Sequence, residues 1–289
     1  MVLEIVSKDN SEEYRGFLPD SFFNDELMLG IVCLDEEEED PIGFTMLTIT
    51  EESLLVEYIF VLEEYRRTGA GSLMLEGAVE MAEAAGVDTL EIYYNSLFGN
   101  EDIPEDFLFS NGFLISEEGE LLEFISSDLL YSDYVKNLKY PKALDAYSCT
   151  SLSSLSDKQK SSLTELLDKH GGSDFLPFCK NDLSYLCEKD EEITGAVLCG
   201  YDEERDLITI MELAAFLDDP MCPAKLLIAL GHYVSENLSK ETGVMFLKTE
   251  ENKVALTVKL LDDESKLKSA GVLLHGVKTI IEENKDGGF

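Results

Sequence analysis

The spacing of apolar side chains predicts a strand, a turn and a helix in the first third of the chain. Residues 54–61 are apolar except at Glu57, which is typical of a mostly buried strand. Beyond residue 71, apolar side chains recur at three- and four-residue steps, as on the buried face of a helix, and Gly86 stands at the expected C-cap. These apolar positions are Leu75, Ala78, Val79 and Ala82. The segment 66–71 is therefore the turn that leads into the helix.

The same pattern is repeated in the second half of the chain, which indicates an internal duplication. At an offset of 152 residues, Gly43 aligns with Gly195, and Leu75 on the helix face aligns with Leu227. We therefore expect two tandem domains of one α/β (α+β) fold, each with a mixed sheet flanked by helices. A proline interrupts a short basic stretch at Tyr140-Pro141, so we expect the domains to be residues 1–140 and 141–289.

The turn Arg66-Arg67-Thr68-Gly69-Ala70-Gly71 has the character of a phosphate site. A helix N-terminus leaves backbone N–H groups unpaired and carries partial positive charge, and glycines let a pyrophosphate approach them. The spacing excludes two common alternatives. The Gly-x-x-x-x-Gly-Lys-Ser/Thr loop is absent, and a dinucleotide fingerprint needs Gly or Ala where this chain has Met74.

The strand, the Glu64-Tyr65-Arg66 segment and the Arg-x-x-Gly-x-Gly turn together resemble the cofactor motif of the GCN5-related N-acetyltransferase (GNAT) family. The resemblance implies two tandem acyl-CoA N-acyltransferase folds, each with a mostly antiparallel sheet, and acetyl-CoA as co-substrate. The resemblance implies that the pantetheine arm binds the backbone of Ile59, Phe60 and Val61. It implies that the pyrophosphate binds the loop residues Arg66, Arg67, Thr68, Gly69, Ala70, Gly71 and Ser72. Asn100 stands near the position of the family's CoA-contacting asparagine. A turn that caps the next helix is an equal explanation for Asn100.

The second copy lacks this loop chemistry. Arg66, Gly69 and Gly71 project onto Asp218, Met221 and Pro223. An aspartate repels phosphate, and a proline removes one of the N–H groups that the cradle needs. We expect the second domain to fold in the same way without binding CoA.

Acetyl transfer to an amine requires a group that accepts a proton, because a lysine-like amine with a pKa of about 10.4 is protonated at neutral pH. Glu57 is the candidate base: it stands on the central predicted strand, where alternation places it on one face with Ile59 and Val61. The family's tyrosine acid would stand four residues before Gly112, where this chain has Leu108. Tyr93 and Tyr94 are alternative proton donors, although packing is the better explanation for each.

Composition narrows the set of partners. The 289 residues include 22 basic and 60 acidic side chains, for a net charge of −38, which argues against nucleic acid and anionic membranes and favours a cationic amine. Six scattered cysteines without Cys-x-x-Cys spacing indicate reduced thiols and no metal site. With no signal-peptide pattern and no apolar run of the ~18 residues that span a bilayer, we expect a cytoplasmic protein.

The sequence thus favours an N-acetyltransferase that moves an acetyl group from acetyl-CoA to a primary amine by direct attack in a ternary complex. The amine is a small molecule or a peptide N-terminus, and the second domain walls the cleft, mediates a homodimer or binds an unrelated ligand. The alternative is a non-catalytic acyl-CoA-binding regulatory or scaffold protein, motivated by Leu108 and by the altered second loop.

Overall fold

The computed structural model forms two compact units. Unit 1 consists of two separate segments of the chain, and unit 2 lies between them in the sequence. Unit 1 contains residues 1–118 and the chain end from Val272, and unit 2 contains residues 119–271. The described residues are 1–280 without 20–21, 24–27, 37–39, 99–103, 134–145, 218, 220 and 250.

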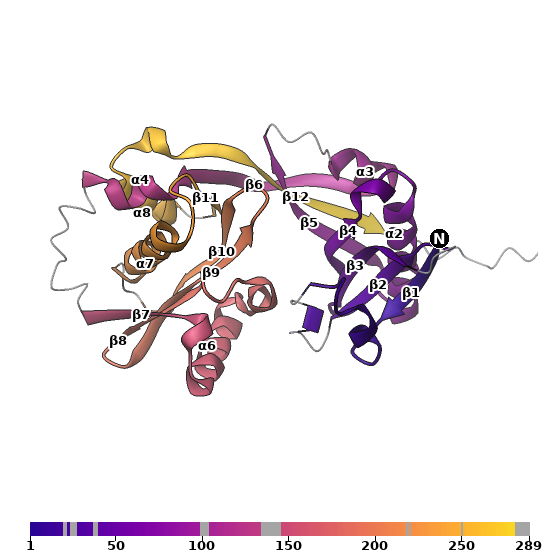
Figure 1. Cartoon of the computed structure of the whole chain (residues 1–289), viewed down its shortest axis with the longest axis horizontal. Helices are drawn as coiled ribbons and strands as arrows, with labels where there is room; N and C mark the ends of the chain where they lie inside the picture. Colours follow the sequence, from indigo (N-terminus) through magenta and orange to yellow (C-terminus); the bar gives the residue numbers. More distant parts are fainter. Residues whose placement is uncertain are drawn as a thin grey trace, which may run out of the picture. The chain divides into compact units, whose positions relative to one another are not determined.

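Unit 1 is built on a mixed sheet in the order β1-β2-β3-β4-β5-β12 (Figure 1). The pairs β1–β2, β2–β3 and β3–β4 are antiparallel, and β4–β5 is parallel. The strands are β1 (Val2–Val6), β2 (Leu29–Leu34), β3 (Pro41–Ile49), β4 (Leu54–Val61), β5 (Thr89–Leu97) and β12 (Lys268–Thr279). The helices are α2 (Ala70–Ala85), α3 (Pro104–Ser110) and the 3₁₀ turns η1 (Ser11–Tyr14) and η2 (Glu63–Tyr65).

Helix α2 covers one face of this sheet with the apolar stripe that the sequence predicts. Leu75, Ala78 and Ala82 are buried, and they share one core cluster with Leu54 and Val56 of β4. The C-cap at Gly86 adopts φ +74°, a left-handed conformation that glycine reaches without a Cβ clash. The strand, helix and cap predicted for this region are confirmed.

Unit 2 repeats the arrangement, with a sheet in the order β7-β8-β9-β10-β11-β6. Only β10–β11 is parallel among its pairs. The strands are β6 (Leu114–Ile125), β7 (Tyr147–Ser151), β8 (Tyr185–Lys189), β9 (Glu192–Asp202), β10 (Leu207–Ala215) and β11 (Gly243–Leu247). The helices are α4 (Ser126–Tyr131), α6 (Asp157–His170), α7 (Met221–Asn237), α8 (Glu251–Leu261) and the 3₁₀ turns η4 (Leu152–Ser154), η5 (Ser173–Phe178) and η6 (Glu264–Lys266).

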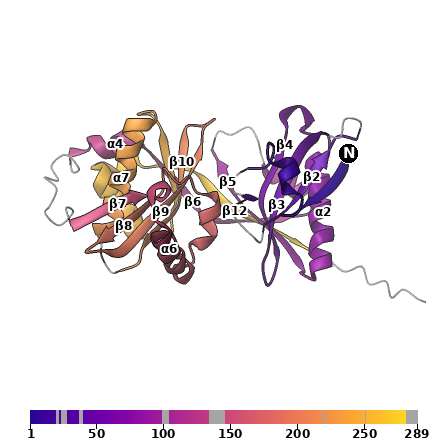
Figure 2. The same cartoon turned by 60° about the horizontal axis from the view of Figure 1, so that its bottom comes forward.

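Helices α6 and α7 cover opposite faces of the unit 2 sheet, as Figures 1 and 2 show. Along β9, Val197 and Cys199 belong to the cluster of α7, whereas Ala196 and Leu198 belong to the cluster of α6. This alternation is the two-residue period of a strand that is buried on both faces. The α/β class and the mixed, mostly antiparallel sheet expected for each domain are confirmed.

Most of the last strand of each repeat belongs to the other unit. Strand β12, from the end of the chain, lies next to β5 in unit 1, where the Ile280 amide donates to the Asp88 carbonyl at 2.8 Å. Strand β6, from the first repeat, pairs with β11 in unit 2, with Ile125 opposite Gly243. The compact units therefore differ from the contiguous ranges 1–140 and 141–289, whose expected boundary at Tyr140-Pro141 lies outside the described residues.

Candidate functional site

The two central strands of unit 1 separate halfway along their length. The pairs between β4 and β5 run from Leu54 with Leu90 to Val56 with Ile92, and none of the described residues continues this pairing. On its other edge, β4 stays paired to β3 as far as Val61. The backbone of residues 57–61 thus faces a gap, and a ligand there can use groups that a neighbouring strand normally takes.

A β-bulge lies at the same place, and the extra residue is Glu57. On β3, Met46 pairs with Tyr58 and Leu47 pairs with Val56, which leaves Glu57 without an opposite residue. Residues before and after the bulge, Val56 and Ile59, both pack in the cluster under α2. The alternation that groups Glu57 with Ile59 and Val61 is therefore interrupted at Glu57 itself, so that the bulge sets its position. Its side chain is half-buried.

The predicted phosphate turn connects β4 to α2 and leaves the helix start open. Gly69 is the N-cap, with φ +98°, and no side chain caps the helix. A Cβ at Gly69 would meet no atom within 4 Å, so the position requires glycine for its backbone conformation, and the space beside it is open. Arg67 also has a positive φ, 64°, and is exposed. The first N–H groups of α2 are the orphan donors of any helix start.

Two side chains brace the turn. Arg66 Nε donates to the Val61 carbonyl at 3.2 Å, and Thr68 Oγ1 donates to the Tyr65 carbonyl at 2.6 Å. Both bonds tie the loop to its own start, which holds its shape. Gly71 has another role: a Cβ there would come within 3.1 Å of the Phe107 ring on α3. This glycine permits close packing of α2 against α3.

The remaining predicted cofactor residues fall into three groups. Ala70 is buried and belongs to the core, whereas Ser72 is half-buried in the first turn of α2. Phe60 lies on the other face of β4, with its ring centroid 5.6 Å from that of Phe44. Asn100 lies outside the described residues. The structure thus brings the loop and the strand together at one place in unit 1.

Leu108, which stands at the position of the GNAT family's tyrosine, is a core residue in the structure. Leu108 is 1 % exposed and packs in the core under α2, so it offers no proton donor. Tyr94, on the separated part of β5, has a buried hydroxyl without a hydrogen-bond partner among the described residues. Glu105 Oε2 is equally buried and unpartnered there, whereas its Oε1 accepts from Ser96 Oγ at 2.6 Å. Burial, together with the Glu105 charge, raises the pKa of Tyr94 to about 12.

His275, on β12, contacts the face of β5 that is opposite to Tyr94. His275 Nε2 lies 2.9 Å from Glu91 Oε2, and Nδ1 lies 3.6 Å from Glu118 Oε1. The Tyr93 ring stacks on the imidazole, with centroids 4.2 Å apart. No sequence pattern links His275 to Glu91, because 184 positions separate them. Only the pairing of β12 with unit 1 reveals this group.

Unit 2 keeps the bulge and the separated strands but closes the helix start. The β9–β10 register shifts between Ile210 and Glu212, and the β10–β11 pairs end at Ile210 with Phe246. At α7, the Asp219 carboxylate accepts from the Met221 amide at 3.1 Å. An anion therefore already occupies the end of the helix that in unit 1 is open.

This carboxylate is held by two further groups. The Tyr147 hydroxyl donates to Asp219 Oδ2, and Lys189 Nζ lies 3.2 Å from the same oxygen. The Tyr147 bond, together with the Met221 amide and Lys189, lowers the pKa of Asp219 below its ordinary value. Pro223 lies in the first turn of α7, as expected, and Asp218 lies outside the described residues.

The described residues contain no group of three or more histidine, cysteine or acidic side chains that could hold a metal ion. All six cysteines are free thiols, and four of them are buried. Among the described helices, none has the length and apolar character that crossing a bilayer requires.

Comparison with known proteins gives one family match and several similar folds. Residues 2–102 match the model of the acetyltransferase (GNAT) family. No curated protein matches the sequence. The whole chain is similar in fold to a tandem GNAT protein from the clavulanic acid biosynthesis pathway. The TM-score is 0.60 at 14% identity, and the match covers 98% of this chain and all of the other.

Two further solved structures agree. A putative acetyltransferase from Pyrococcus horikoshii gives a TM-score of 0.51 at 13% identity over 96% of this chain and 89% of its own. A GCN5-related glucosamine N-acetyltransferase region of a fungal GH3 β-N-acetylglucosaminidase gives 0.54 at 10% identity over 96% of this chain and 38% of its own. Residues 2–102 thus match the GNAT family model, and the whole chain has the fold of tandem GNAT proteins, with a second copy whose helix start is capped by Asp219.

Proposed function

We propose that the protein is an N-acetyltransferase that transfers an acetyl group from acetyl-CoA to a primary amine in unit 1. The observation that carries the proposal is the combination, at one place, of an uncapped helix start and two separated central strands. Family membership supports acyl transfer from an acyl-CoA at a coarse level.

The residues of unit 1 fit acetyl-CoA at two points. The open space and φ of Gly69, with the orphan amides at the start of α2, suit a pyrophosphate. The unpaired edge of β4, from Ile59 to Val61, suits the amide groups of a pantetheine arm. The Val61 carbonyl already accepts from Arg66, and the Phe60 carbonyl faces Gly43 of β3, so the Ile59 backbone and the Val61 amide supply the remaining groups.

Glu57 is the proposed general base. The bulge places it where β4 and β5 separate, half-buried beside the gap. It takes one proton from the acceptor ammonium, directly or through water, and the neutral nitrogen then attacks the acetyl carbonyl. A C–N bond forms, the C–S bond breaks, and the electron pair leaves on sulfur; the sulfur gains one proton as the new amide nitrogen loses its second proton. No covalent enzyme intermediate is needed, because positioning in a ternary complex supplies much of the rate.

Tyr94 is the proposed proton donor to the departing sulfur. Its hydroxyl is buried and has no partner among the described residues, although a buried hydroxyl without a partner costs about 1–3 kcal/mol. A group that arrives with the thioester and accepts from Tyr94 would remove this cost. Tyr93, in contrast, is 48 % exposed and stacked on His275, which a packing role explains.

The acceptor is proposed to be a cationic or neutral amine, either a small molecule or a peptide N-terminus. The net charge of −38 attracts cations and repels nucleic acid and anionic membranes. The six free thiols fit the cytoplasmic location expected from the sequence.

Calorimetric titration with acetyl-CoA, followed by a thiol-release assay against pooled amines, tests the proposal. We expect saturable binding and thiol release with at least one amine. Absence of binding at about 1 mM acetyl-CoA would overturn it.

Binding without thiol release would favour the second candidate, a non-catalytic acyl-CoA-binding regulator. The observation in favour of that candidate is Leu108, which fills the position of the family's tyrosine with a buried apolar side chain.

A further inference from the structure

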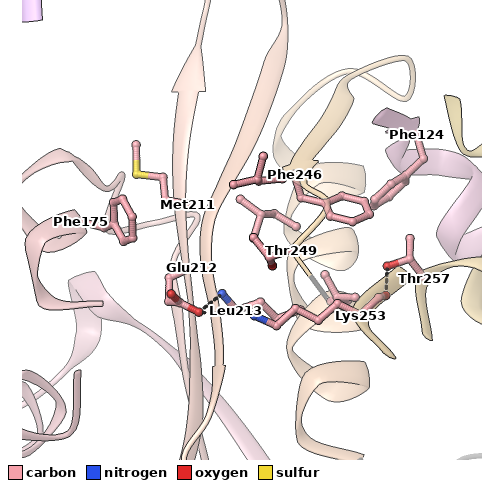
Figure 3. A pocket seen from close by; sticks show the side chains of 12 residues that line it. Phe124, Phe175, Met211, Glu212, Leu213, Phe246, Thr249, Lys253 and Thr257 are labelled. Carbon is pink, nitrogen blue, oxygen red and sulfur yellow. Dashed lines mark hydrogen bonds and ion pairs between the residues drawn. The ribbon is translucent and has the colours of Figure 1, made fainter. Parts of the chain in front are cut away.

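Unit 2 contains a cavity at the point where its own central strands separate. The cavity has a volume of about 190 Å³ and lies beyond the last β10–β11 pair, between the bulge of β10 and helix α8 (Figure 3). Unit 2 has thus kept the cleft of its fold, although Asp219 closes the helix start that a pyrophosphate would need.

The walls of the cavity are aromatic and aliphatic. The apolar lining includes Phe124, Phe175, Met211, Leu213, Leu227 and Phe246. A cavity of about 150 Å³ lined by such side chains holds a benzene molecule. The present volume therefore suits one aromatic ring or one branched aliphatic chain, with a few further atoms.

Two opposite charges stand side by side on the lining. Glu212 Oε1 and Lys253 Nζ form an ion pair at 3.8 Å, and Figure 3 shows it across the space below Thr249. The Leu213 amide also donates to Glu212 Oε1, at 2.9 Å, which fixes the carboxylate on the strand. The ion-pair distance exceeds the 2.7–2.9 Å of a direct charge-assisted hydrogen bond.

This pattern selects for the charge of the ligand. An anion alone would meet Lys253 but also Glu212 and a protein of net charge −38. A cation alone would meet Glu212 but also Lys253. A zwitterion matches both, because its carboxylate approaches Lys253 while its ammonium approaches Glu212, and its net charge of zero removes the long-range repulsion.

We propose that the cavity of unit 2 binds a free α-amino acid with a large apolar side chain. The side chain fills the apolar space, and the ammonium and carboxylate replace the direct Glu212–Lys253 pair with two ion pairs through the ligand. This site is separate from the proposed acetyl-CoA site, since every residue that carries it belongs to unit 2.

The test is calorimetric titration of the full chain with L-phenylalanine, L-leucine and L-methionine. Phenethylamine lacks the carboxylate, 3-phenylpropionate lacks the ammonium, and glycine lacks the side chain. We expect at least one of the three amino acids to bind. Each analogue that lacks the carboxylate, the ammonium or the side chain should bind about tenfold or more weakly.

Variants locate the site. Lys253→Met and Glu212→Gln should each weaken amino-acid binding by about tenfold or more, whereas Lys259→Met, on the same helix but outside the lining, should leave it unchanged. Thermal unfolding of each variant shows that it still folds. Thr68→Glu, in the loop of unit 1, should also leave amino-acid binding unchanged, which separates this site from the proposed transferase site.

Three results would overturn the proposal. The first is no binding of any of the three amino acids at about 10 mM. The second is binding of 3-phenylpropionate as tight as that of L-phenylalanine, with no effect of Glu212→Gln, which would indicate a plain carboxylate site. The third is loss of amino-acid binding in Thr68→Glu, which would place the ligand in unit 1. None of these results depends on whether acetyl transfer occurs.

Discussion

Units 1 and 2 share a bulge, a separated strand pair and a central helix, but their helices begin in opposite chemical states. In unit 1 the helix start is glycine with open space beside it. In unit 2 the same end is capped by Asp219, which Tyr147 and Lys189 hold in place. The comparison teaches that the separated strands and the open helix start are independent features, because unit 2 keeps the separated strands without the open helix start.

The strongest test of the comparison separates the units. Residues 1–140 expressed alone lack β12, so β5 loses its neighbour and Ile280 no longer donates to Asp88. We expect no cooperative thermal transition by circular dichroism. Residues 1–118 joined through a Gly/Ser linker to residues 272–280 restore that strand and should unfold cooperatively. A cooperative transition of the 1–140 fragment would contradict the assignment of β12 to unit 1.

Glu57→Gln removes the proposed base without changing the size of the side chain. We expect kcat to fall by about 10²–10⁴ with little change in acetyl-CoA affinity. Glu52→Gln, an exposed carboxylate in the turn before β4, is the matched control and should keep full activity. An unchanged kcat in Glu57→Gln would remove this residue from the mechanism.

Thr68→Glu places a negative charge in the turn that is proposed to hold the pyrophosphate. We expect the Kd for acetyl-CoA to rise about 100-fold, or about 3 kcal/mol, measured by calorimetry. Ser161→Glu adds the same charge to an exposed position of α6 in unit 2 and should leave the Kd unchanged. Equal Kd values for the two variants would mean that the turn does not contact the co-substrate. Gly71 is a poorer target, because a larger residue would strike Phe107.

Tyr94→Phe separates activity from stability. Removing a buried hydroxyl without a partner should raise the free energy of unfolding by up to about 1 kcal/mol, while kcat falls about tenfold or more. The shape of the pH–rate profile should stay the same within the working range, since the pKa of Tyr94 is raised to about 12 and the donor stays protonated there. Tyr93→Phe is the matched control and should change neither quantity. A Tyr94→Phe enzyme with full activity would assign the tyrosine to packing.

Asp219→Ala should have the smallest effect. It removes the helix cap of unit 2 and costs about 1 kcal/mol, measured by chemical denaturation at pH 7. The folded-state pKa of Asp219 is lowered, so its contribution is complete above the ordinary pKa of about 3.9 and is lost as the pH falls through the lower folded value. The difference between the two proteins should therefore vanish in acid. Asp168→Ala, an exposed position on α6, should show no such pH dependence.

Local features of the site were predictable from the sequence, because they rest on near neighbours in the chain. The run 54–61, the glycine turn and the helix stripe all follow from short-range periodicity, and the structure confirms each one. The same holds for the second helix, where Leu227 is buried as the alignment predicts. The separate roles of Gly69 and Gly71 needed the structure, because Phe107 lies on another helix.

Features that depend on distant pairing were not predictable. The bulge at Glu57 requires the register of β3 against β4, and strand alternation alone gave a different reason for its position. The His275–Glu91 pair and the exchange of β6 and β12 join segments from opposite ends of the chain. A repeat in a sequence shows that two copies exist, but it does not show which copy completes which sheet.

Because each repeat supplies a strand to the sheet of the other, neither repeat can be lost without damage to the other. A duplicate that merely sat beside the first copy could be deleted once its loop no longer served. Here deletion would remove β12, the strand that completes the sheet of the unit with the open helix start. The loop of the second repeat can therefore change by mutation, whereas the fold of the second repeat is kept because unit 1 needs β12.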